Sequence, residues 1–335
     1  MKKNFANISI ALACVMVLAS ASSSHAAFPR TADGYPSKPI VNILPYPAGG
    51  GLDISLRLIA SFIPKYLGQP MVVDNQPGGS SVPGTLATGK ANPDGYTIGT
   101  STYSLFTIRP FVLTLPYTQD DFSYIIGMFD QRQVLAVRTD APFKTFEDLI
   151  KHAKANDGKL NYTGGGNSSL QHILGEWLGL KAGFKAEFIP YDGARPSAVA
   201  LLGGRVDYAI LALENVKPEL EAGSFRLLAC FQNERLMEAP NVPTIAELGY
   251  GEVMMPQTQM MIAPKGMPAD RVKIVHDAVK QVLEDPEFQA MLAKTNVEIL
   301  YKSGATCLQE IVDLKKTLSS FIYELFPEFK KTLKK

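Results

Sequence analysis

The sequence predicts an α/β fold with two lobes, each a mostly parallel sheet flanked by helices. Short β-like apolar runs alternate with helical runs almost throughout the chain, a pattern typical of parallel sheets whose faces are covered by helices. The length of 335 residues suggests two domains. The two halves also share a plan, because a strand meets a glycine-rich loop at Gly49-Gly50-Gly51 and again at Gly164-Gly165-Gly166, and both loops lead into helices.

The amino-terminal segment predicts export. Lys2 and Lys3 precede an apolar run over 8–19, and Ser24-His25-Ala26 offers a small-x-small cleavage site. These are the parts of a secretory signal peptide, and the apolar run is too short for a membrane span. We expect residues 1–26 to be removed by cleavage after Ala26, with Ala21 as the second choice.

Charge and cysteine content narrow the function classes further. The formal net charge is +1 without a basic cluster, which argues against a nucleic-acid-binding face. Cys230 and Cys307 lie among apolar neighbours and lack metal-ligand spacing, so two buried free thiols are favoured over a disulfide. Cys14 raises a lipoprotein alternative, but the residues before it form a poor lipobox.

The expected elements follow from hydrophobic periodicity. Strands are expected at 41–44, 71–73, 97–100, 124–128, 134–137, 160–162, 187–190, 206–210 and 225–230. Helices are expected at 54–66, 145–155, 169–182, 196–203, 269–284, 286–294 and 307–323. Pro64 should end or kink the first helix.

The stretch NILPYPAGGGLDISLRLI places the first glycine loop between a buried strand and the amino end of a helix. Asp53 is a plausible N-cap, because Leu56, Ile59 and Ile63 repeat behind it at helical spacing. A glycine turn at that point exposes N–H groups in front of the positive end of the helix dipole. The sequence therefore predicts an anion site.

Motifs for other chemistries are incomplete. The segment GTLATGKA, residues 84–91, resembles a phosphate loop, but Ala91 stands where the magnesium-binding hydroxyl belongs, so a surface helix is expected instead. No dinucleotide fingerprint and no helical zinc pair appear, so no cofactor and no metal are expected. Ser168 and Ser169 could be nucleophiles, but the G-x-S-x-G motif is absent and a hydrogen-bond donor role is favoured.

Four ring-bearing side chains stand beside predicted strand ends. Tyr46, Tyr103 and Tyr191 could close a core edge or wall a cleft with their polar tips. His172 follows the second glycine loop by one turn, and structural hydrogen bonding and a place in the cleft wall both remain open.

At family level, the opening YPSKPIVNILPYPAGGGLDISLRLIASFIPKYLGQPMVVDNQPGG resembles the extracytoplasmic solute receptors of tripartite tricarboxylate transporters, the Bug family. The resemblance continues in order through ANPDGYTIGTST, FKTFEDLIKHAKANDGKLNYTGGGNSSLQHILGEW, FIPYDGARPSAVALLGGRVD, NVPTIAELGY and IAPKGMPADRV. It covers nearly all of the mature chain.

The resemblance implies a hinged periplasmic binding protein of type II, the Venus-flytrap architecture, which closes on a small carboxylic acid and presents it to a membrane permease. It implies binding loops in both lobes whose backbone N–H groups and hydroxyls hold the ligand. Carried over to this chain, the loops comprise Tyr46, Ala48, Gly49, Gly50, Ser101, Thr102, Tyr103, Gly165, Gly166, Asn167, Ser168, Ser169, His172, Tyr191 and Asp192.

The chain departs from the family pattern in two places. Asp192 fills a position that is often basic or neutral, and Leu211 and Ala212 stand where many members have a polar pair. Fewer polar groups there indicate a more apolar ligand body or a shifted site.

The expected organisation is a signal peptide over 1–26, a first lobe over 27–130 and 254–335, and a second lobe over 131–253, with hinges near 129–133 and 254–262. The expected function is that of a monomeric periplasmic receptor, not an enzyme, for a small organic dicarboxylate or an aromatic acid. A sensor subunit for a membrane kinase is the alternative within binding proteins. An exported hydrolase is the alternative from another class, but no base matched to Ser168 can be named.

Overall fold

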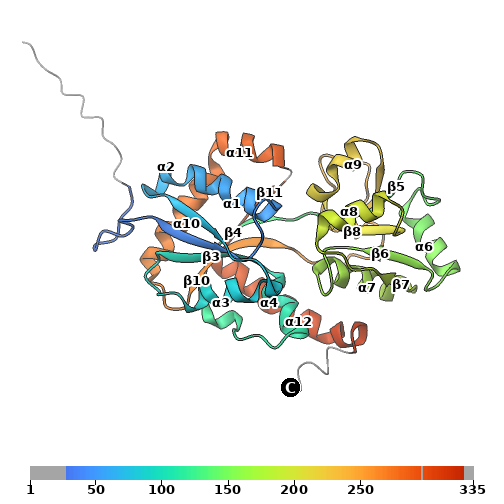
Figure 1. Cartoon of the computed structure of the whole chain (residues 1–335), viewed down its shortest axis with the longest axis horizontal. Coiled ribbons are helices and arrows are strands. Elements are labelled where there is room, and N and C mark those ends of the chain that lie inside the picture. The colour runs from blue at the N-terminus through green and yellow to red at the C-terminus, as the bar shows by residue number, and fades with distance from the viewer. Residues whose placement is uncertain (1–27, 296, 328–335) are drawn as a thin grey trace, which may run out of the picture.

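Two β-sheets, each with its own helices, make up the protein (Figure 1). The computed structural model describes residues 28–295 and 297–327. The expected signal peptide, with Cys14, lies outside the described residues. We call the body that carries the six-stranded sheet lobe 1 and the body that carries the five-stranded sheet lobe 2.

Lobe 1 holds a sheet of strand order β11-β4-β10-β3-β1-β2. Its strands are β1 Ile40–Leu44, β2 Met71–Asn75, β3 Thr97–Thr102, β4 Phe122–Asp130, β10 Thr258–Pro264 and β11 Glu298–Ser303. Its helices are α1 Gly51–Phe62, α2 Pro64–Leu67, α3 Val82–Lys90, α4 Ser104–Thr107, α5 Arg109–Val112, α10 Ala269–Glu284, α11 Pro286–Leu292 and α12 Gly304–Leu325. The break between α1 and α2 at Ile63 confirms the expected effect of Pro64.

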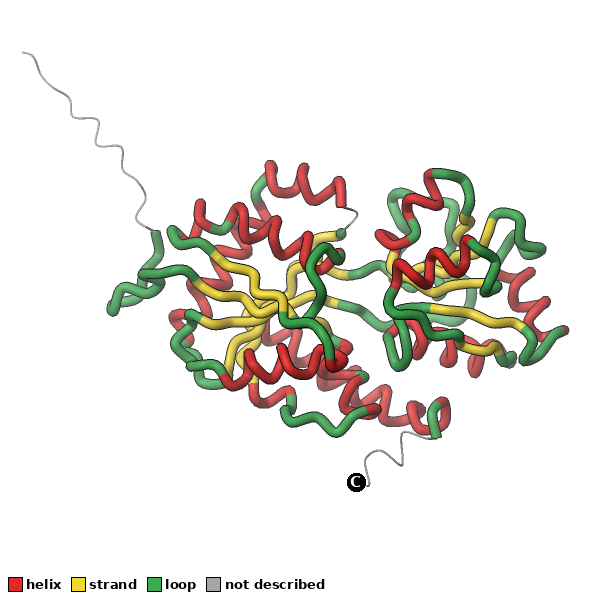
Figure 2. The backbone as a smooth tube through the Cα atoms, in the orientation of Figure 1, coloured by secondary structure: helices red, strands yellow, loops and turns green. Residues whose placement is uncertain are grey.

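Lobe 2 holds a sheet of strand order β7-β6-β8-β5-β9. Its strands are β5 Gln133–Arg138, β6 Leu160–Thr163, β7 Ala186–Phe188, β8 Tyr208–Ala212 and β9 Phe225–Cys230. Its helices are α6 Phe146–Ala155, α7 Leu170–Ala182, α8 Ala194–Leu202 and α9 Lys217–Glu221. Figure 2 shows these helices packed around the yellow strands of the second sheet.

Both sheets are mixed, whereas the sequence predicts mostly parallel ones. β1 runs parallel to β2 and β3, but β10 is antiparallel to both β3 and β4. In lobe 2, β6 is parallel to β7 and β8, while β5 is antiparallel to β8 and β9. The physical reason is that the chain leaves lobe 1 through β4 and returns through β10, so the returning strand enters the first sheet in the opposite direction.

Helix α12 contacts both lobes. Its first half packs Cys307 and Ile311 into a lobe 1 cluster with Tyr103 and Met260. Its second half places Leu318 and Ile322 in the largest apolar cluster, together with the C-cap residue Phe326. Most of that cluster belongs to lobe 2, but it also includes Ile108, Phe111 and Val112 of lobe 1. The expected map assigns 254–335 to the first lobe, and α12 packs on β4, α4 and β11 of that lobe while its carboxyl-terminal half also reaches α7 of lobe 2.

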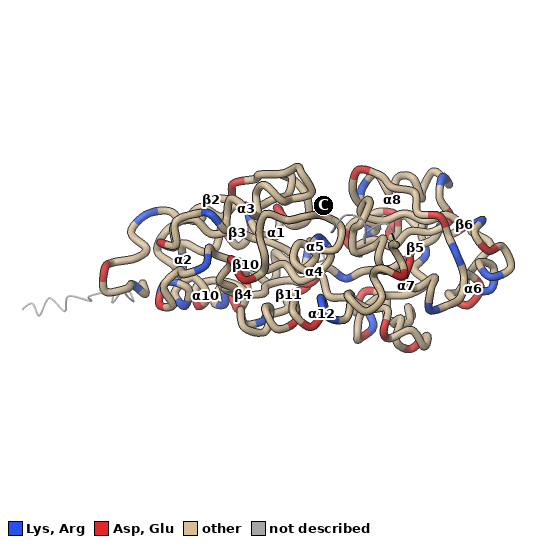
Figure 3. Tube along the Cα trace, turned by 90° about the horizontal axis from the view of Figure 1, so that it is seen from below, with Lys and Arg blue, Asp and Glu red and all other residues tan. Residues whose placement is uncertain are grey.

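The remaining expectations concern the cysteines, the near-phosphate loop and the charge. Cys230 and Cys307 are free thiols buried in different lobes. The GTLATGKA segment forms most of helix α3, which Ala91 caps with its N–H to Thr88 O. Basic and acidic residues are scattered over both lobes (Figure 3). In the described part of the chain, no helix is long and apolar enough to cross a membrane.

Candidate functional site

A chain of hydroxyl groups begins at the end of β3 in lobe 1. The Tyr46 hydroxyl lies 2.7 Å from Thr102 Oγ1, which lies 3.1 Å from Ser104 Oγ. The side chain of Gln257 donates to that Ser104 hydroxyl across 3.2 Å. Since Gln257 directly precedes β10, this network connects two predicted site residues, Tyr46 and Thr102, with the segment where the chain returns from lobe 2.

The amino end of α1 differs from the expected cap. Gly50 is the N-cap residue and contributes no side chain, while Asp53 lies in the first turn. The Asp53 carboxylate accepts the Gly49 N–H at 2.9 Å, the Asn75 amide at 2.9 Å and the Arg57 Nε at 3.0 Å. One N–H of the predicted anion loop is therefore already satisfied by the chain itself.

These contacts keep Asp53 ionised. Burial raises the pKa of its carboxyl, but the hydrogen bonds from Arg57, Gly49 and Asn75 outweigh burial, and the pKa lies below its usual value. A fixed negative charge at the amino end of α1 also interacts favourably with the helix dipole. The loop is consequently less open to a second anion than its sequence indicates.

A second carboxylate approaches the same helix end from lobe 2. Glu214, in the 3-10 turn Leu213–Asn215 after β8, places Oε1 3.6 Å from the point where a Cβ on Gly51 would lie. Gln131, in the first crossing segment, donates its side-chain amide to that Oε1 across 3.0 Å. Burial raises the pKa of the Glu214 carboxyl above its usual value. The sequence contains no local signal for this contact between lobes.

The glycine loop of lobe 2 is held by close packing. A Cβ on Gly164 would lie 2.5 Å from the Gln171 Cβ, so only glycine fits between the loop and α7. A Cβ on Gly166 would lie 3.3 Å from the Tyr191 carbonyl oxygen, which places these two predicted site residues side by side. The buried Ser197 hydroxyl joins the same two loops by hydrogen bonds to the Gly164 and Gly193 carbonyls.

Ser168, Ser169 and His172 form the start of α7. Ser169 is the N-cap, and its hydroxyl accepts the His172 N–H at 3.2 Å. His172 Nδ1 in turn accepts the Ser168 N–H at 3.2 Å, and the ring stacks on Phe188 with centroids 3.8 Å apart. Burial lowers the pKa of His172 to about 4, so the ring is neutral at pH 7. Of the two roles open to His172, structural hydrogen bonding is the one that the contacts show.

The other predicted site residues differ in solvent exposure. Ala48, Gly49, Gly50, Asn167 and Asp192 are exposed, and Gly165 is partly exposed. Ser101 is buried, and its hydroxyl has no partner among the described residues.

Tyr103 does not fit the predicted role. It is fully buried, and its hydroxyl donates to Glu310 of α12 across 2.7 Å. The reason is the turn from β3 into α4, which directs Thr102 toward Tyr46 but sends the next side chain into the core. Leu211 and Ala212, the positions that depart from the family pattern, are buried within β8.

Arg109 is a residue that the sequence interpretation missed. It opens helix α5, is partly buried, and makes no side-chain hydrogen bond or ion pair within the described residues. Burial lowers the pKa of its guanidinium, and the groups that act on it electrostatically are the phenols of Tyr46 and Tyr117. A signal was available, because Arg109 is the only charged residue between Asp94 and Asp120.

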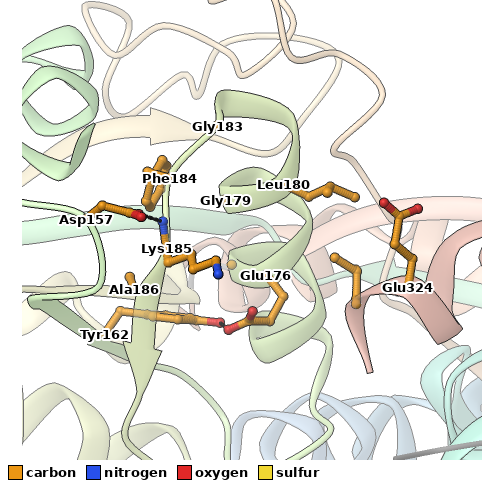
Figure 4. A pocket seen from close by; sticks show the side chains of 12 residues that line it. Asp157, Tyr162, Glu176, Gly179, Leu180, Gly183, Phe184, Lys185, Ala186 and Glu324 are labelled. Atoms are coloured by element: carbon orange, nitrogen blue, oxygen red, sulfur yellow. Dashed lines mark hydrogen bonds between the residues drawn. The ribbon is translucent and has the colours of Figure 1, made fainter. Parts of the chain in front are cut away.

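Two cavities lie away from the predicted residues. One, of about 370 Å³, is an open pocket lined by α7, the segment 183–186 and the end of α12, and Figure 4 shows the Tyr162 hydroxyl next to the Glu176 carboxylate in its lining. The other, of about 520 Å³, lies beside the crossing segments and is lined by charged groups that include Asp130, Arg132 and Lys302. Within the described ranges, no three metal-ligating side chains gather into a group that could hold a metal ion.

The chain is similar to known proteins over most of its length. Residues 55–325 match the model of the tripartite tricarboxylate transporter family receptor. A curated relative, the UPF0065 protein of the gbd 5′ region of Cupriavidus necator, is 34% identical over 88% of this chain and 89% of its own. The structure of the periplasmic binding protein BugD is 26% identical, covers 87% of this chain and 98% of its own, and has a TM-score of 0.75.

A further structure, from R. palustris with adipate, is 26% identical, covers 87% of this chain and 98% of its own, and has a TM-score of 0.78. These likenesses confirm the predicted two-lobed α/β fold class.

Proposed function

Because the chain belongs to the tripartite tricarboxylate transporter receptor family, as its sequence predicts, we propose that it captures a small organic acid between its lobes and delivers it to a membrane permease. The chain is a receptor and not an enzyme. The acid is a dicarboxylate or an aromatic carboxylate, and the site is built from the predicted loops of both lobes, without Tyr103.

The observation that carries the proposal is that each lobe has polar loops among the predicted site residues. Lobe 1 offers the Tyr46 and Thr102 hydroxyls, and lobe 2 offers the Ser168 loop beside Tyr191. Donors of this kind suit a carboxylate, since hydrogen bonds to charged groups are the strong ones. The similar structure with adipate supports the same ligand class.

The contacts of Ser168 argue against hydrolysis. A seryl nucleophile needs a base within hydrogen-bond reach of its hydroxyl. His172 Nδ1 instead accepts the backbone N–H of Ser168, and its Nε2 lies 3.9 Å from Glu176. Both ring nitrogens are therefore directed at groups other than the hydroxyl.

Ligand binding can be tested by thermal unfolding of the purified mature protein with mono-, di- and tricarboxylates. A bound acid should raise the melting temperature as its concentration exceeds the dissociation constant, and mass analysis should return the acid unchanged. Ser168→Ala should weaken binding with little loss of stability, because a hydroxyl at a loop tip supports few folded-state contacts. Turnover that disappears in Ser168→Ala would instead establish the hydrolase.

In this proposal the protein is a monomer in the periplasm, and residues 1–26 have been removed. The similarity to a periplasmic binding protein supports the location. The mass of the exported protein should correspond to a chain that begins at Ala27, and light scattering should give the mass of a single chain. A chain that keeps residues 1–26 would refute the cleavage, and a dimer would refute the assembly.

A further inference from the structure

The strands that connect the lobes divide each sheet into two sides. In lobe 1, the crossing strands β4 and β10 lie between β11 on one side and β3, β1 and β2 on the other. In lobe 2, β5 follows the first crossing and lies between β9 on one side and β8, β6 and β7 on the other. The predicted binding loops follow β1, β3, β6 and β7, so they all lie on the same side of the crossings, which we call the ligand side.

The opposite side, the back side, contains a pocket between the lobes. This pocket, of about 520 Å³, is lined by Glu298 of β11 in lobe 1 and by 231–237, the segment that follows β9 in lobe 2. Parts of both lobes therefore face each other behind the crossings, away from the predicted binding loops.

The side chains of the first crossing alternate between these two sides. Gln131 donates to Glu214 at 3.0 Å on the ligand side, whereas its neighbours Asp130 and Arg132 line the pocket on the back side. Successive side chains of an extended chain point to opposite faces in this way. Asp130 also accepts the Gln257 N–H at 2.9 Å, which ties the two crossings together. The joined crossings thus form a pivot between the ligand side and the back side.

An arginine connects the lobes on the back side. Arg132 is only 6% exposed, and its two terminal nitrogens each donate to the Glu238 carboxylate of lobe 2 at 2.8 Å. Its Nε lies 3.6 Å from Oε2 of Glu298, the first residue of β11 in lobe 1. One cation is therefore shared by carboxylates of both lobes. We call Glu238, Arg132 and Glu298 the ion triad.

Closing the ligand side must change the ion triad. A rotation about the crossings that brings the binding loops together separates the lobes on the back side, because the crossings lie between the two sides. Such a rotation moves Glu298 away from Arg132 and Glu238. The attraction between opposite charges falls as their separation grows. The ion triad therefore favours the arrangement in which the ligand side is open.

We infer that Arg132 and Glu298 lower the affinity for the ligand by opposing closure of the lobes around it. The inference rests on the proposed function, in which the acid binds between the lobes, and it assigns the regulation of that site to residues on the back side. The apparent affinity of a protein falls with the population of its binding-competent arrangement. A substitution that weakens the ion triad should raise that population and tighten binding.

Three variants test the ion triad. Glu298→Gln removes the lobe 1 charge from a side chain that is 50% exposed, so the fold should tolerate it. Arg132→Gln leaves the Glu238 and Glu298 carboxylates without the cation between them. Glu284→Gln is the matched control, because it removes the same charge from an ion pair with Lys280, 3.7 Å long, that lies within α10 of lobe 1.

The first measurement reports the separation of the lobes without ligand. Spin labels are attached to the full mature protein through Asp74→Cys and Glu187→Cys, and pulsed electron resonance gives the distance between them. Both residues are exposed, and they lie in β2 and β7, the outermost strands of the ligand side. Closure should shorten the distance. Cys230 and Cys307 are buried, and the protein without added cysteines measures any label that they take up.

The second measurement is affinity. Acetate, hexanoate, benzoate, malate, adipate and citrate are titrated calorimetrically into the mature protein, and the acid that the wild type binds most tightly is used for the variants. Glu298→Gln should shift the ligand-free protein toward shorter label distances and tighten binding by about two- to fivefold, the scale of one partly exposed ion pair. Arg132→Gln should act in the same direction, and Glu284→Gln should match the wild type in both measurements.

The two kinds of failure are distinguishable. If Glu298→Gln keeps the wild-type label distances or the wild-type affinity, or binds the acid more weakly, the inference is wrong, although the receptor function stands. If Arg132→Gln does not fold, Glu298→Gln and its control still decide the outcome. If the wild-type protein binds none of the six acids, the proposed function fails and the regulation of its affinity fails with it, while the label distances still show whether the ion triad holds the lobes open.

Discussion

Glu214 of lobe 2 approaches the helix end at Gly51 of lobe 1: its Oε1 lies 3.6 Å from the position that a Cβ on that glycine would take. The contact joins the lobes at the place where the sequence predicts a ligand carboxylate. Gln131, between β4 and β5, holds the same oxygen at 3.0 Å. A charged side chain of the protein thus occupies part of the space between the predicted binding loops.

The first prediction concerns Glu214→Gln. The change removes a negative charge next to the predicted loops and keeps a side chain that can still contact Gln131. Binding of a carboxylate should tighten by about 1 kcal/mol, or roughly fivefold. This is the size expected for the repulsion between two carboxylates that solvent partly screens. Calorimetric titration at low and high salt checks this, because screening should reduce the difference. Weaker binding by the variant would show that the glutamate itself contacts the ligand.

The second prediction separates Gly50 from Gly49. A Cβ on Gly50 would meet the Pro47 carbonyl at an ordinary 3.6 Å, and φ there is −78°. Gly49 has φ of +81°, where an alanine is strained. Gly50→Ala should therefore melt like the wild type but bind the acid more weakly, by up to about tenfold from steric crowding of the loop.

Gly49→Ala should lose stability as well, by about 1 kcal/mol. Measuring melting temperature and affinity on both variants distinguishes crowding from strain. Wild-type affinity in Gly50→Ala would mean that the glycine serves only the strand-to-helix turn.

The third prediction is an acid sensitivity that originates in His172. Its pKa is about 4 when folded, because the ring is buried, against 6.5 in the unfolded chain. Above pH 6.5 the ring is neutral in both states, and the fold keeps its full stability. As the pH falls from 6.5 toward 4, the unfolded chain takes up a proton that the folded protein does not, and the free energy of unfolding falls by up to about 3 kcal/mol. His172→Gln should unfold more easily at pH 7.5 but lose less stability between pH 6.5 and 4.5. Equal slopes of melting temperature against pH in both proteins would contradict the assignment.

The fourth prediction has the opposite sign and concerns Asp130, which ends β4. Burial raises its pKa to about 6, although Lys302 and the Gln257 N–H favour the charged form. The folded state therefore holds the proton more tightly than the unfolded chain, whose value is 3.8. The free energy of unfolding therefore falls as the pH rises from 3.8 to about 6, by up to about 3 kcal/mol.

Asp130→Asn keeps an oxygen for the Gln257 N–H, which the aspartate accepts at 2.9 Å. It should raise the melting temperature at pH 7.5 and make no difference near pH 4, where the wild-type carboxyl is protonated in the folded state. Urea unfolding at the two pH values measures the effect. A variant that is less stable at pH 7.5 would show that the Lys302 attraction exceeds the cost of burial.

The fold could be predicted from the sequence where periodicity is strong. The runs that became β1, β5, β9 and α10 have the spacing of buried strands and an amphipathic helix, and they were found close to their true bounds. β11 escaped because its residues are mostly half-exposed at a sheet edge and show no continuous apolar run. The residues of α3 are rich in glycine, threonine and alanine, so its helical face is weakly marked.

The site was less accessible to sequence reasoning. The loops could be found because glycines and hydroxyls cluster at strand ends, but the direction of a side chain at a turn could not, and Tyr103 was misplaced for that reason. Nor could the sequence indicate that Glu214 meets Gly51, since that contact joins residues far apart in the chain. Arg109 was overlooked because the sequence does not show whether an arginine has an acidic partner in the fold.

The path of α12 limits how the lobes can move. Two chain crossings by themselves leave a pair of bodies free to rotate about one axis. The stacking of Trp177 on Phe321, with ring centroids 4.3 Å apart, adds a third attachment. Helix α12, which carries Phe321, lies below the two crossings in Figure 1. When one lobe rotates relative to the other about the crossings, α12 must slide along α7. The apolar side chains of α12 then change their neighbours on lobe 2. Trp177 is the only tryptophan of the chain, so its emission gives an optical record of that sliding without any added label.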